Sequence, residues 1–218
     1  MTRRRCSSLR RMSGLAALCL MTSACGSDPE PGPADRPAST ASDSNDQAQA
    51  KAPAAPQTAP ILTADGFGPL RIGMTLADVV TTYGPDSDPG SVGGPEPESC
   101  DQFRPARAPA DLLVMIEEGR LTRISLLSGS EVKTDRGLHL GLSGAQIRAA
   151  YGPELRAEPH KYADPPAEYL TVWTRGGPGA DGIASEGSRG IRYEIGSDGN
   201  VATIHTGGDS IQYVEGCL

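Results

Sequence analysis

The sequence contains two similar stretches, GPLRIGMTLADVVTTYGP at positions 68–85 and RGLHLGLSGAQIRAAYGP at positions 136–153. They align without a gap at an offset of 68, and the matches fall on apolar, hydroxyl, aromatic and Gly-Pro positions. Chance agreement among abundant glycines and prolines would not extend to the apolar and hydroxyl positions. A repeat of this kind is typical of a duplicated structural unit. We therefore expect two copies of one unit, repeat 1 at residues 61–134 and repeat 2 at residues 135–218.

Each stretch predicts a short strand followed by a capped helix. Apolar residues alternate with polar ones at 70–72 and again at 138–140, which is the pattern of a half-buried strand. Thr75 or Ser143 stands where a side chain can cap the following helix. A Gly-Pro pair ends each helix, since glycine accepts positive φ and proline cannot continue the helix. The tyrosine before each pair is expected to pack on a sheet.

A second correspondence follows downstream, where alternating apolar residues predict a hairpin in each copy. The first pairs 111–116 with 121–127, and the second pairs 191–195 with 201–205 around an Asp-Gly-Asn turn. Gly119 and Gly199 in the turns are offset by 80, so repeat 2 carries about 12 extra residues. The Gly-rich segment 176–187 is the expected insertion, predicted to form a mobile loop.

Further strands are expected at Cys100–Arg104, Tyr169–Thr174 and Ser210–Val214. Each copy then has a strand, a helix and a three-stranded meander, which is an α+β fold with a helix on one face of an antiparallel sheet. One helix leaves the other face of the sheet partly open, and two copies could bury or share these faces.

The pattern G-x-L-x-hydrophobic-G-[ML]-[TS]-x-x-[DQ]-[VI], closing on Gly-Pro, resembles the beta-lactamase-inhibitory-protein-like superfamily, which includes small outer-membrane assembly lipoproteins of the SmpA/OmlA type. The resemblance covers residues 62–217 as two tandem units. It implies a helix-on-sheet fold, a binding role and often a cell-envelope location. Two features differ: this chain is poor in aromatic residues, and its two downstream cysteines lie in different copies. Inhibition of lactamases is therefore not carried over.

The N-terminal segment 1–24 has the composition of a bacterial secretory signal peptide. It holds five of the 20 basic residues and none of the 27 acidic ones, so the rest of the chain has a net charge of −12. A short apolar run and the small residues Thr22-Ser23-Ala24 follow, as signal peptides require. The run is far shorter than the ~20 residues of a membrane span.

Cys25 follows these small residues directly, which resembles the lipobox of bacterial lipoproteins, although Thr22 stands where leucine is usual. That resemblance implies that Cys25 is the lipidation site and carries the membrane anchor, with palmitate among its acyl groups. Cleavage after Ala24 by ordinary signal peptidase is the alternative. Residues 26–60 include seven prolines and none of Val, Ile, Leu, Met, Phe, Trp or Tyr. Such a segment is expected to be a disordered tether, so residues 25–60 read as lipid site plus linker.

The five cysteines divide according to this organisation. Cys6 and Cys19 belong to the signal peptide and Cys25 to the lipid site, which leaves Cys100 and Cys217. An even pair in an oxidising compartment favours a disulfide over two free thiols. Two cysteines lack the further ligands of a zinc site.

Known catalytic patterns are absent from the sequence, which contains no G-x-S-x-G, H-E-x-x-H, Walker loop or C-x-x-C. His139, His160 and His205 are far apart in sequence. Two of them, His139 and His205, alternate along predicted strands, where an exposed strand histidine is the favoured interpretation. Asp198-Gly199-Asn200 reads as a hairpin turn rather than a calcium loop.

Three arginines, the aromatic content and the net charge bear on the kind of partner. Arg71, Arg120 and Arg123 could form a small basic patch for an acidic glycan or lipid, but a solvated sheet face is the default. Nine aromatic residues and a net charge of −7 argue against nucleic acid as a partner. No cofactor, metal or catalytic residue is expected.

The sequence leaves two classes of function. The first is a non-catalytic lipoprotein, lipid-anchored in the bacterial cell envelope and facing the periplasm at the outer membrane, whose repeats bind a protein partner or help to assemble a complex. The second is a secreted or periplasmic hydrolase or enzyme inhibitor with a site assembled by the fold, which applies if Cys25 is not lipidated. A large apolar patch would favour the first, and a cleft joining a histidine to a carboxylate and a hydroxyl would favour the second.

Overall fold

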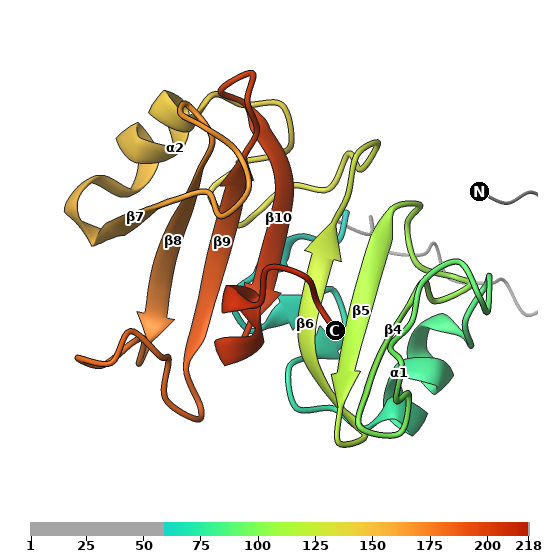
Figure 1. Cartoon of the computed structure of the whole chain (residues 1–218). Coiled ribbons are helices and arrows are strands. Elements are labelled where there is room, and N and C mark those ends of the chain that lie inside the picture. The colour runs from blue at the N-terminus through green and yellow to red at the C-terminus, as the bar shows by residue number, and fades with distance from the viewer. Residues whose placement is uncertain (1–58, 218) are drawn as a thin grey trace, which may run out of the picture. The chain divides into compact units, whose positions relative to one another are not determined.

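A seven-stranded antiparallel sheet forms the centre of the protein. The computed structural model describes residues 59–217, so the expected signal peptide, Cys25 and nearly all of the tether lie outside the described residues. The strand order is β4-β5-β6-β10-β9-β8-β7 (Figure 1). The bounds are β4 Cys100–Phe103, β5 Leu112–Glu117, β6 Arg120–Leu126, β7 Leu155–Pro159, β8 Glu168–Arg175, β9 Arg189–Ile195 and β10 Val201–Gly207. The fold is mixed but dominated by strands, as the α+β expectation implied.

The two expected helices are present and are capped as the sequence predicted. Helix α1 spans Leu76–Tyr83 and α2 spans Gly144–Tyr151. Thr75 and Ser143 each accept a hydrogen bond from the backbone N–H three residues on, and the side chain of that residue binds the cap backbone in return. This reciprocal capping box satisfies two of the backbone donors that a helix start leaves unpaired. Gly84 and Gly152 follow the last helical residues with positive φ.

The loop before each helix is attached to a hairpin turn by the same set of hydrogen bonds. In one half, Gly73 N donates to Leu121 O and Leu121 N donates to Met74 O, at 2.7 and 2.8 Å. In the other half, Gly141 N donates to Val201 O and Val201 N to Leu142 O, at 2.9 and 2.8 Å. The amide that starts each helix then donates to the carbonyl of Gly119 or Gly199. The residues of the two sets correspond at the offsets found in the sequence: the loop residues differ by 68 positions and the turn residues by 80.

The two halves join edge to edge through β6 and β10. The register pairs Leu126 with Ile204 and Ile124 with Thr206, with Ser125 opposite His205 between them. The described residues, 59–217, belong to one compact unit. The expected boundary between 134 and 135 therefore separates two halves of one sheet, and the halves share an edge rather than a face.

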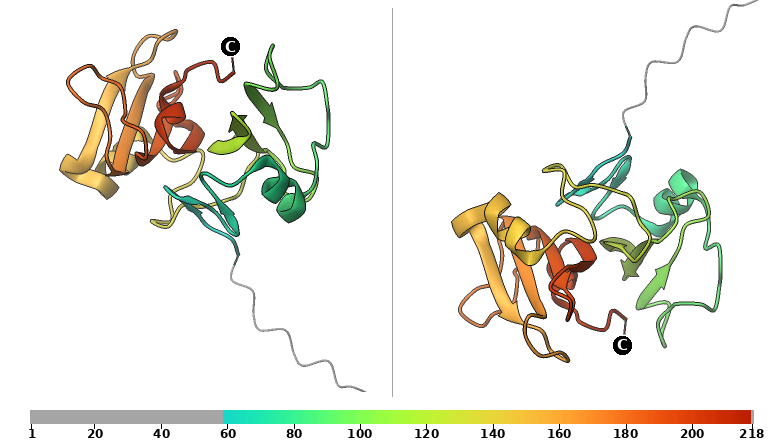
Figure 2. Two further views of the ribbon diagram at one scale, coloured as in Figure 1. Left: turned by 90° about the horizontal axis from the view of Figure 1, so that it is seen from below. Right: turned by 90° about the horizontal axis from the view of Figure 1, so that it is seen from above.

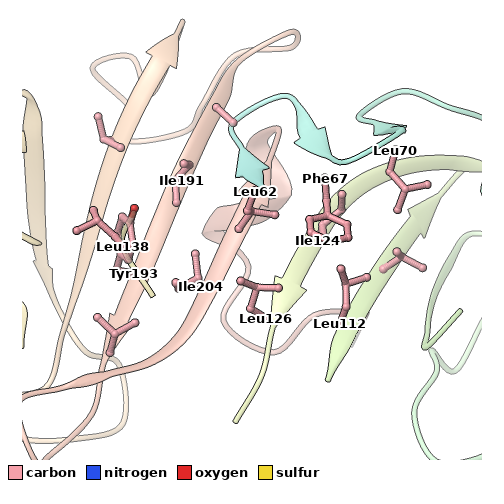
Figure 3. Close-up of a cluster of buried hydrophobic side chains, with 14 of the residues drawn as sticks. Leu62, Phe67, Leu70, Leu112, Ile124, Leu126, Leu138, Ile191, Tyr193 and Ile204 are labelled. Atoms are coloured by element: carbon pink, nitrogen blue, oxygen red, sulfur yellow. The ribbon is translucent and has the colours of Figure 1, made fainter. Parts of the chain in front are cut away.

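The hydrophobic core lies on one face of this sheet. Helices α1 and α2 cover this face together with a small sheet of three two-residue strands (Figure 2), β1 Leu62–Thr63, β2 Gly66–Phe67 and β3 Leu70–Arg71. Leu62 and Phe67 are fully buried and point toward the large sheet near Ile204 and Ile124 (Figure 3). Tyr151 packs in the same core, where its hydroxyl lies 2.8 Å from that of Tyr193. Burial of these apolar residues is the main stabilising contribution to the fold.

The structure corrects three of the expected strands. Residues 138–140, predicted as a strand, form none. The strand predicted at 70–72 is present as β3, but it belongs to the small sheet and not to the large one. The expected strand Ser210–Val214 is wrong, because residues Asp209–Gln212 form a 3₁₀ helix, η2. Strand β7 was not expected, and a 3₁₀ turn, η1 Gly152–Glu154, leads into it.

Candidate functional site

The C-terminal segment, residues Gly208–Cys217, crosses the face of the sheet opposite the helices (Figure 2). We call this face the tail face. Helix η2 contacts β6, β9 and β10 there. A Cβ at Gly190 of β9 would lie 2.7 Å from Val172 O of the neighbouring strand β8 and 3.2 Å from Ile211 Cδ1 of η2, so this position has little room for a side chain. The open sheet face that the sequence led us to expect is therefore covered by the chain itself.

Two buried arginines hold the C-terminal segment by its backbone. Arg123 Nη1 of β6 donates to Ser210 O and Tyr213 O, each at 3.1 Å, and its Nη2 donates to Gln102 Oε1 at 2.9 Å. Arg192 Nη1 of β9 donates to Ile211 O at 3.1 Å. Ser210 O also accepts from Tyr213 N within the helix, so the arginines are additional partners there, and they supply side-chain donors to Ile211 O and Tyr213 O at the helix end.

Both guanidinium groups are buried without a carboxylate at ion-pair distance among the described residues. Burial lowers the pKa of Arg123 to about 10 and lowers that of Arg192 as well. Arg192 Cζ lies 3.7 Å from the centre of the Tyr169 ring, whose face stabilises the cation. The Nε atoms of both arginines have no hydrogen-bond partner among residues 59–217.

A network of one hydroxyl, two imidazoles and one carboxylate lies beside this arginine pair. Ser125 Oγ lies 2.8 Å from His205 Nδ1. His205 Nε2 lies 3.8 Å from Glu194 Oε2, which is longer than a hydrogen bond. His160 Nε2 lies 3.1 Å from Glu194 Oε1, and the His160 ring stacks on Tyr169 at 4.7 Å. Residues of β6, β10, β9 and the β7–β8 loop thus meet on the tail face.

Burial and charge set the protonation of this network. The rings of His205 and His160 hold the pKa of the Glu194 carboxyl at about 2. Burial lowers the pKa of His205 to about 4, and the positive charges of Arg123 and Arg192 act in the same direction. At neutral pH, Glu194 is therefore an anion and His205 is neutral. A neutral His205 accepts from Ser125 through one ring nitrogen and presents N–H toward Glu194 with the other.

The serine, histidine and carboxylate follow one another in the order of a hydrolytic triad. However, the serine is not placed where a substrate could reach it. Ser125 is only 2% exposed, so no substrate carbonyl can reach its hydroxyl without rearrangement of the protein. The imidazole also presents Nδ1 to the serine, whereas serine proteases of the Ser-His-Asp type use Nε2. The arrangement is suited to structure: the Ser125–His205 contact joins β6 to β10, and the His160–Glu194 contact joins the β7–β8 loop to β9.

A pocket of about 760 Å³ opens beside this network. Its lining includes Lys161, next to His160 in the chain, together with Glu117 and Cys100 from the other half of the sheet. Residues 212–217 of the C-terminal segment also line it, and Tyr213 and Val214 are exposed there. Pockets of this size are typical of ligand and peptide sites.

The structure joins the two cysteines that the sequence singled out. Cys100 and Cys217 form a disulfide with their Cα atoms 5.4 Å apart. This bond ties the end of the C-terminal segment to edge strand β4, and both cysteines line the pocket. Cys25, the expected lipidation site, lies outside the described residues.

The other candidate residues are dispersed. Arg71, Arg120 and Arg123, which could have formed a small basic patch, do not come together, because Arg123 is buried on the tail face while Arg71 and Arg120 bind backbone carbonyls elsewhere. The default expectation of a solvated sheet face is wrong for Arg123. The expectation of an exposed strand histidine is wrong for His205, whose side chain is only 13% exposed because it packs beneath the covered sheet face. Asp198 accepts from Asn200 N in a hairpin turn, as predicted.

The described residues contain neither a metal-binding cluster nor a membrane-spanning helix. Within residues 59–217, no group of three or more His, Cys, Asp or Glu side chains is arranged to hold a metal ion. In the same part of the chain, no helix has the length and apolar character of a membrane span.

The Gly-rich insertion 176–187 is attached to the C-terminal segment. Gln212 Nε2 donates to Gly182 O at 2.9 Å, and Ala184 N donates to Gln212 Oε1 at 2.8 Å. The insertion therefore contributes contacts to the same segment that the arginines hold.

Comparison with known proteins identifies no relative: no family model, curated protein or solved structure matches this chain.

Proposed function

We propose that this chain is a non-catalytic lipoprotein of the bacterial cell envelope, anchored through Cys25, whose folded part binds a protein partner. The pocket on the tail face is the observation that carries the binding role. Its walls come from both halves of the sheet and from the C-terminal segment, and exposed Tyr213 and Val214 lie in it. Exposed apolar side chains around a hollow are typical of protein interaction sites.

The same proposal treats the folded part as two copies of one helix-on-sheet unit, similar to the beta-lactamase-inhibitory-protein-like superfamily. The matching capping boxes and loop-to-turn hydrogen bonds support this organisation. The pairing of β6 with β10 has the same symmetry. At the offset of 80, Leu126 corresponds to Thr206 and Ile124 to Ile204, so the pair Leu126–Ile204 is equivalent to the pair Thr206–Ile124. A local two-fold axis would then pass between Ser125 and His205.

Palmitate labelling and site-directed photo-cross-linking test the proposal together. The wild-type chain, expressed in bacteria, is expected to incorporate labelled palmitate, whereas Cys25→Ser is not. A photoreactive phenylalanine analogue at Val214 is expected to give a discrete adduct with an envelope protein. Leu76, which is 43% exposed on α1 on the opposite face of the sheet, is the control position and should give none. Unlabelled wild-type chain in the medium contradicts the anchor, and no adduct at Val214 contradicts the binding site.

The Ser125–His205–Glu194 network makes hydrolysis the second candidate function. A fluorophosphonate probe reacts with activated serines, so it reports directly on this alternative. Because Ser125 is 2% exposed, we expect wild type and Ser125→Ala to be equally unlabelled. Labelling of the wild type that Ser125→Ala abolishes would replace the binding role with a catalytic one.

A further inference from the structure

The lining of the tail-face pocket carries more negative than positive charge. Glu96, Glu117 and Glu215 contribute carboxylates, and Lys161 is the single cationic side chain among the lining residues. Glu96 and Glu215 are exposed and Glu117 is half-buried, so all three carboxylates are at least partly accessible to solvent. The remaining lining is largely apolar or uncharged and includes Pro95, Tyr213, Val214 and the disulfide.

The negative charge of the pocket affects the pKa of the Tyr213 hydroxyl. Its pKa is raised first by burial and then by the negative charges of Glu117 and Asp209, which disfavour the phenolate. The buried cations of the tail face offset this negative charge only in part. Arg123 and Arg192 donate to backbone carbonyls beneath the C-terminal segment, and Arg123 acts electrostatically on Glu117 and on the Tyr213 hydroxyl. Glu96 and Glu215 are exposed in the lining. The opening therefore presents carboxylates around exposed aromatic and aliphatic side chains.

We infer that the pocket receives a basic segment of a protein partner, in which lysine or arginine side chains alternate with apolar ones. Long cationic side chains are complementary to both kinds of lining residue. Their alkyl stems would pack on Tyr213 and Val214, and their charged ends would reach the carboxylates. A tyrosine face can also hold a cation, as Tyr162 does for Lys161 Nζ at 5.2 Å from its ring centre.

This inference rests on the proposed binding role, and it adds the chemistry of the partner. An acidic segment is disfavoured, because it would place its carboxylates against those of Glu96, Glu117 and Glu215. A purely apolar segment would bury these three groups without partners, which carries a desolvation cost.

The test measures binding of two labelled peptides to the full chain by fluorescence anisotropy. One peptide alternates lysine with tyrosine, and the other has glutamate in place of each lysine. We expect the lysine peptide to bind and the glutamate peptide not to bind. The triple variant Glu96→Gln, Glu117→Gln, Glu215→Gln should weaken binding about tenfold, since exposed charge pairs are individually weak and three act together.

Two further variants distinguish an effect of the pocket carboxylates on binding from an effect of net charge and from an effect of misfolding. Glu118→Gln, Glu131→Gln, Glu186→Gln changes the net charge equally at exposed positions that do not line the pocket, and it should leave binding unchanged. Lys161→Gln should strengthen binding of the lysine peptide severalfold, a gain that a damaged fold would not produce. Equal weakening by both triple variants, or tighter binding of the glutamate peptide, overturns the inference. An adduct at position 214 without pocket-dependent binding of the lysine peptide also overturns it, but leaves the proposed binding role in place.

Discussion

Replacing Cys217 with serine is expected to lower the free energy of unfolding by about 4–5 kcal/mol. The Cys100–Cys217 disulfide joins residues 117 apart in sequence, so it excludes a large share of the conformations of the unfolded chain. For a domain of this size, the loss corresponds to a fall in Tm of roughly 10–20 °C. Urea unfolding of the wild type and the variant under non-reducing conditions measures it.

The double variant Cys100→Ser, Cys217→Ser is the control for this prediction. Both single changes remove the same bond, so the double variant should be no less stable than either single one. Losses that add would show that each cysteine stabilises the fold by its own packing, which contradicts the prediction.

Hydrogen exchange should show how the C-terminal segment responds to the missing bond. Arg123 and Arg192 still hold Ser210, Ile211 and Tyr213 by their carbonyls. Protection of the Ile211 and Tyr213 amides, which donate within η2, should therefore persist, while residues 214–217 exchange rapidly. Complete loss of protection at Ile211 would show that the disulfide, not the arginine pair, positions this helix.

Local rules were sufficient for the helices and hairpins. Thr75 and Ser143 precede helical patterns at capping positions, and Gly199 occupies a turn that requires positive φ. Each of these features depends on neighbours within a few residues, which a sequence shows directly.

The errors occur where distant contacts determine the structure. Strand β7 is mostly exposed, so Leu155–Pro159 lacks the apolar alternation that marks a half-buried strand. The segment Ser210–Val214 alternates apolar and polar residues, but two buried arginines bind its carbonyls and favour a 3₁₀ helix. Neither arginine is near this segment in sequence.

The candidate site was missed for the same reason. Ser125 and His205 are 80 residues apart, and they meet only because β6 and β10 pair across the two halves. The offset of 80 contained a usable signal, since it places these two residues at equivalent positions of the two hairpins. An antiparallel pairing of equivalent strands about that position would have brought them together.

Acidification is expected to destabilise the protein, beginning near pH 6.5, because of His205. Its folded-state pKa of about 4 lies below its usual value of 6.5, so the unfolded chain takes up a proton at a higher pH than the folded one. Stability from this group is fully present above pH 6.5 and is lost as the pH falls to 4, by about 3 kcal/mol in total.

The charged groups around His205 determine this direction. Arg123 of β6 and Arg192 of β9 disfavour its protonated form, and Glu194 of β9 favours it without overcoming the effect of burial. Glu194 itself has a pKa of about 2 against a usual 4.5, so its contribution is present above pH 4.5 and is lost between 4.5 and 2. Both shifts therefore lower stability in acid, and His205 acts first.

Urea unfolding of wild type and His205→Gln at pH 7.0, 5.5 and 4.5 separates this effect from general acid sensitivity. The glutamine is neutral throughout, so the variant should begin with lower stability at pH 7.0 and lose less between pH 7.0 and 4.5. His139→Gln removes a histidine on a loop, and it should retain the wild-type slope. If His205→Gln and the wild type lose stability in parallel, then the pKa of His205 is the same in the folded and the unfolded protein, which contradicts the prediction. If the wild type instead gains stability relative to His205→Gln as the pH falls, then His205 is already protonated in the folded protein. In that case it would pair with Glu194 as a cation, and Ser125 would be its hydrogen-bond acceptor rather than its donor.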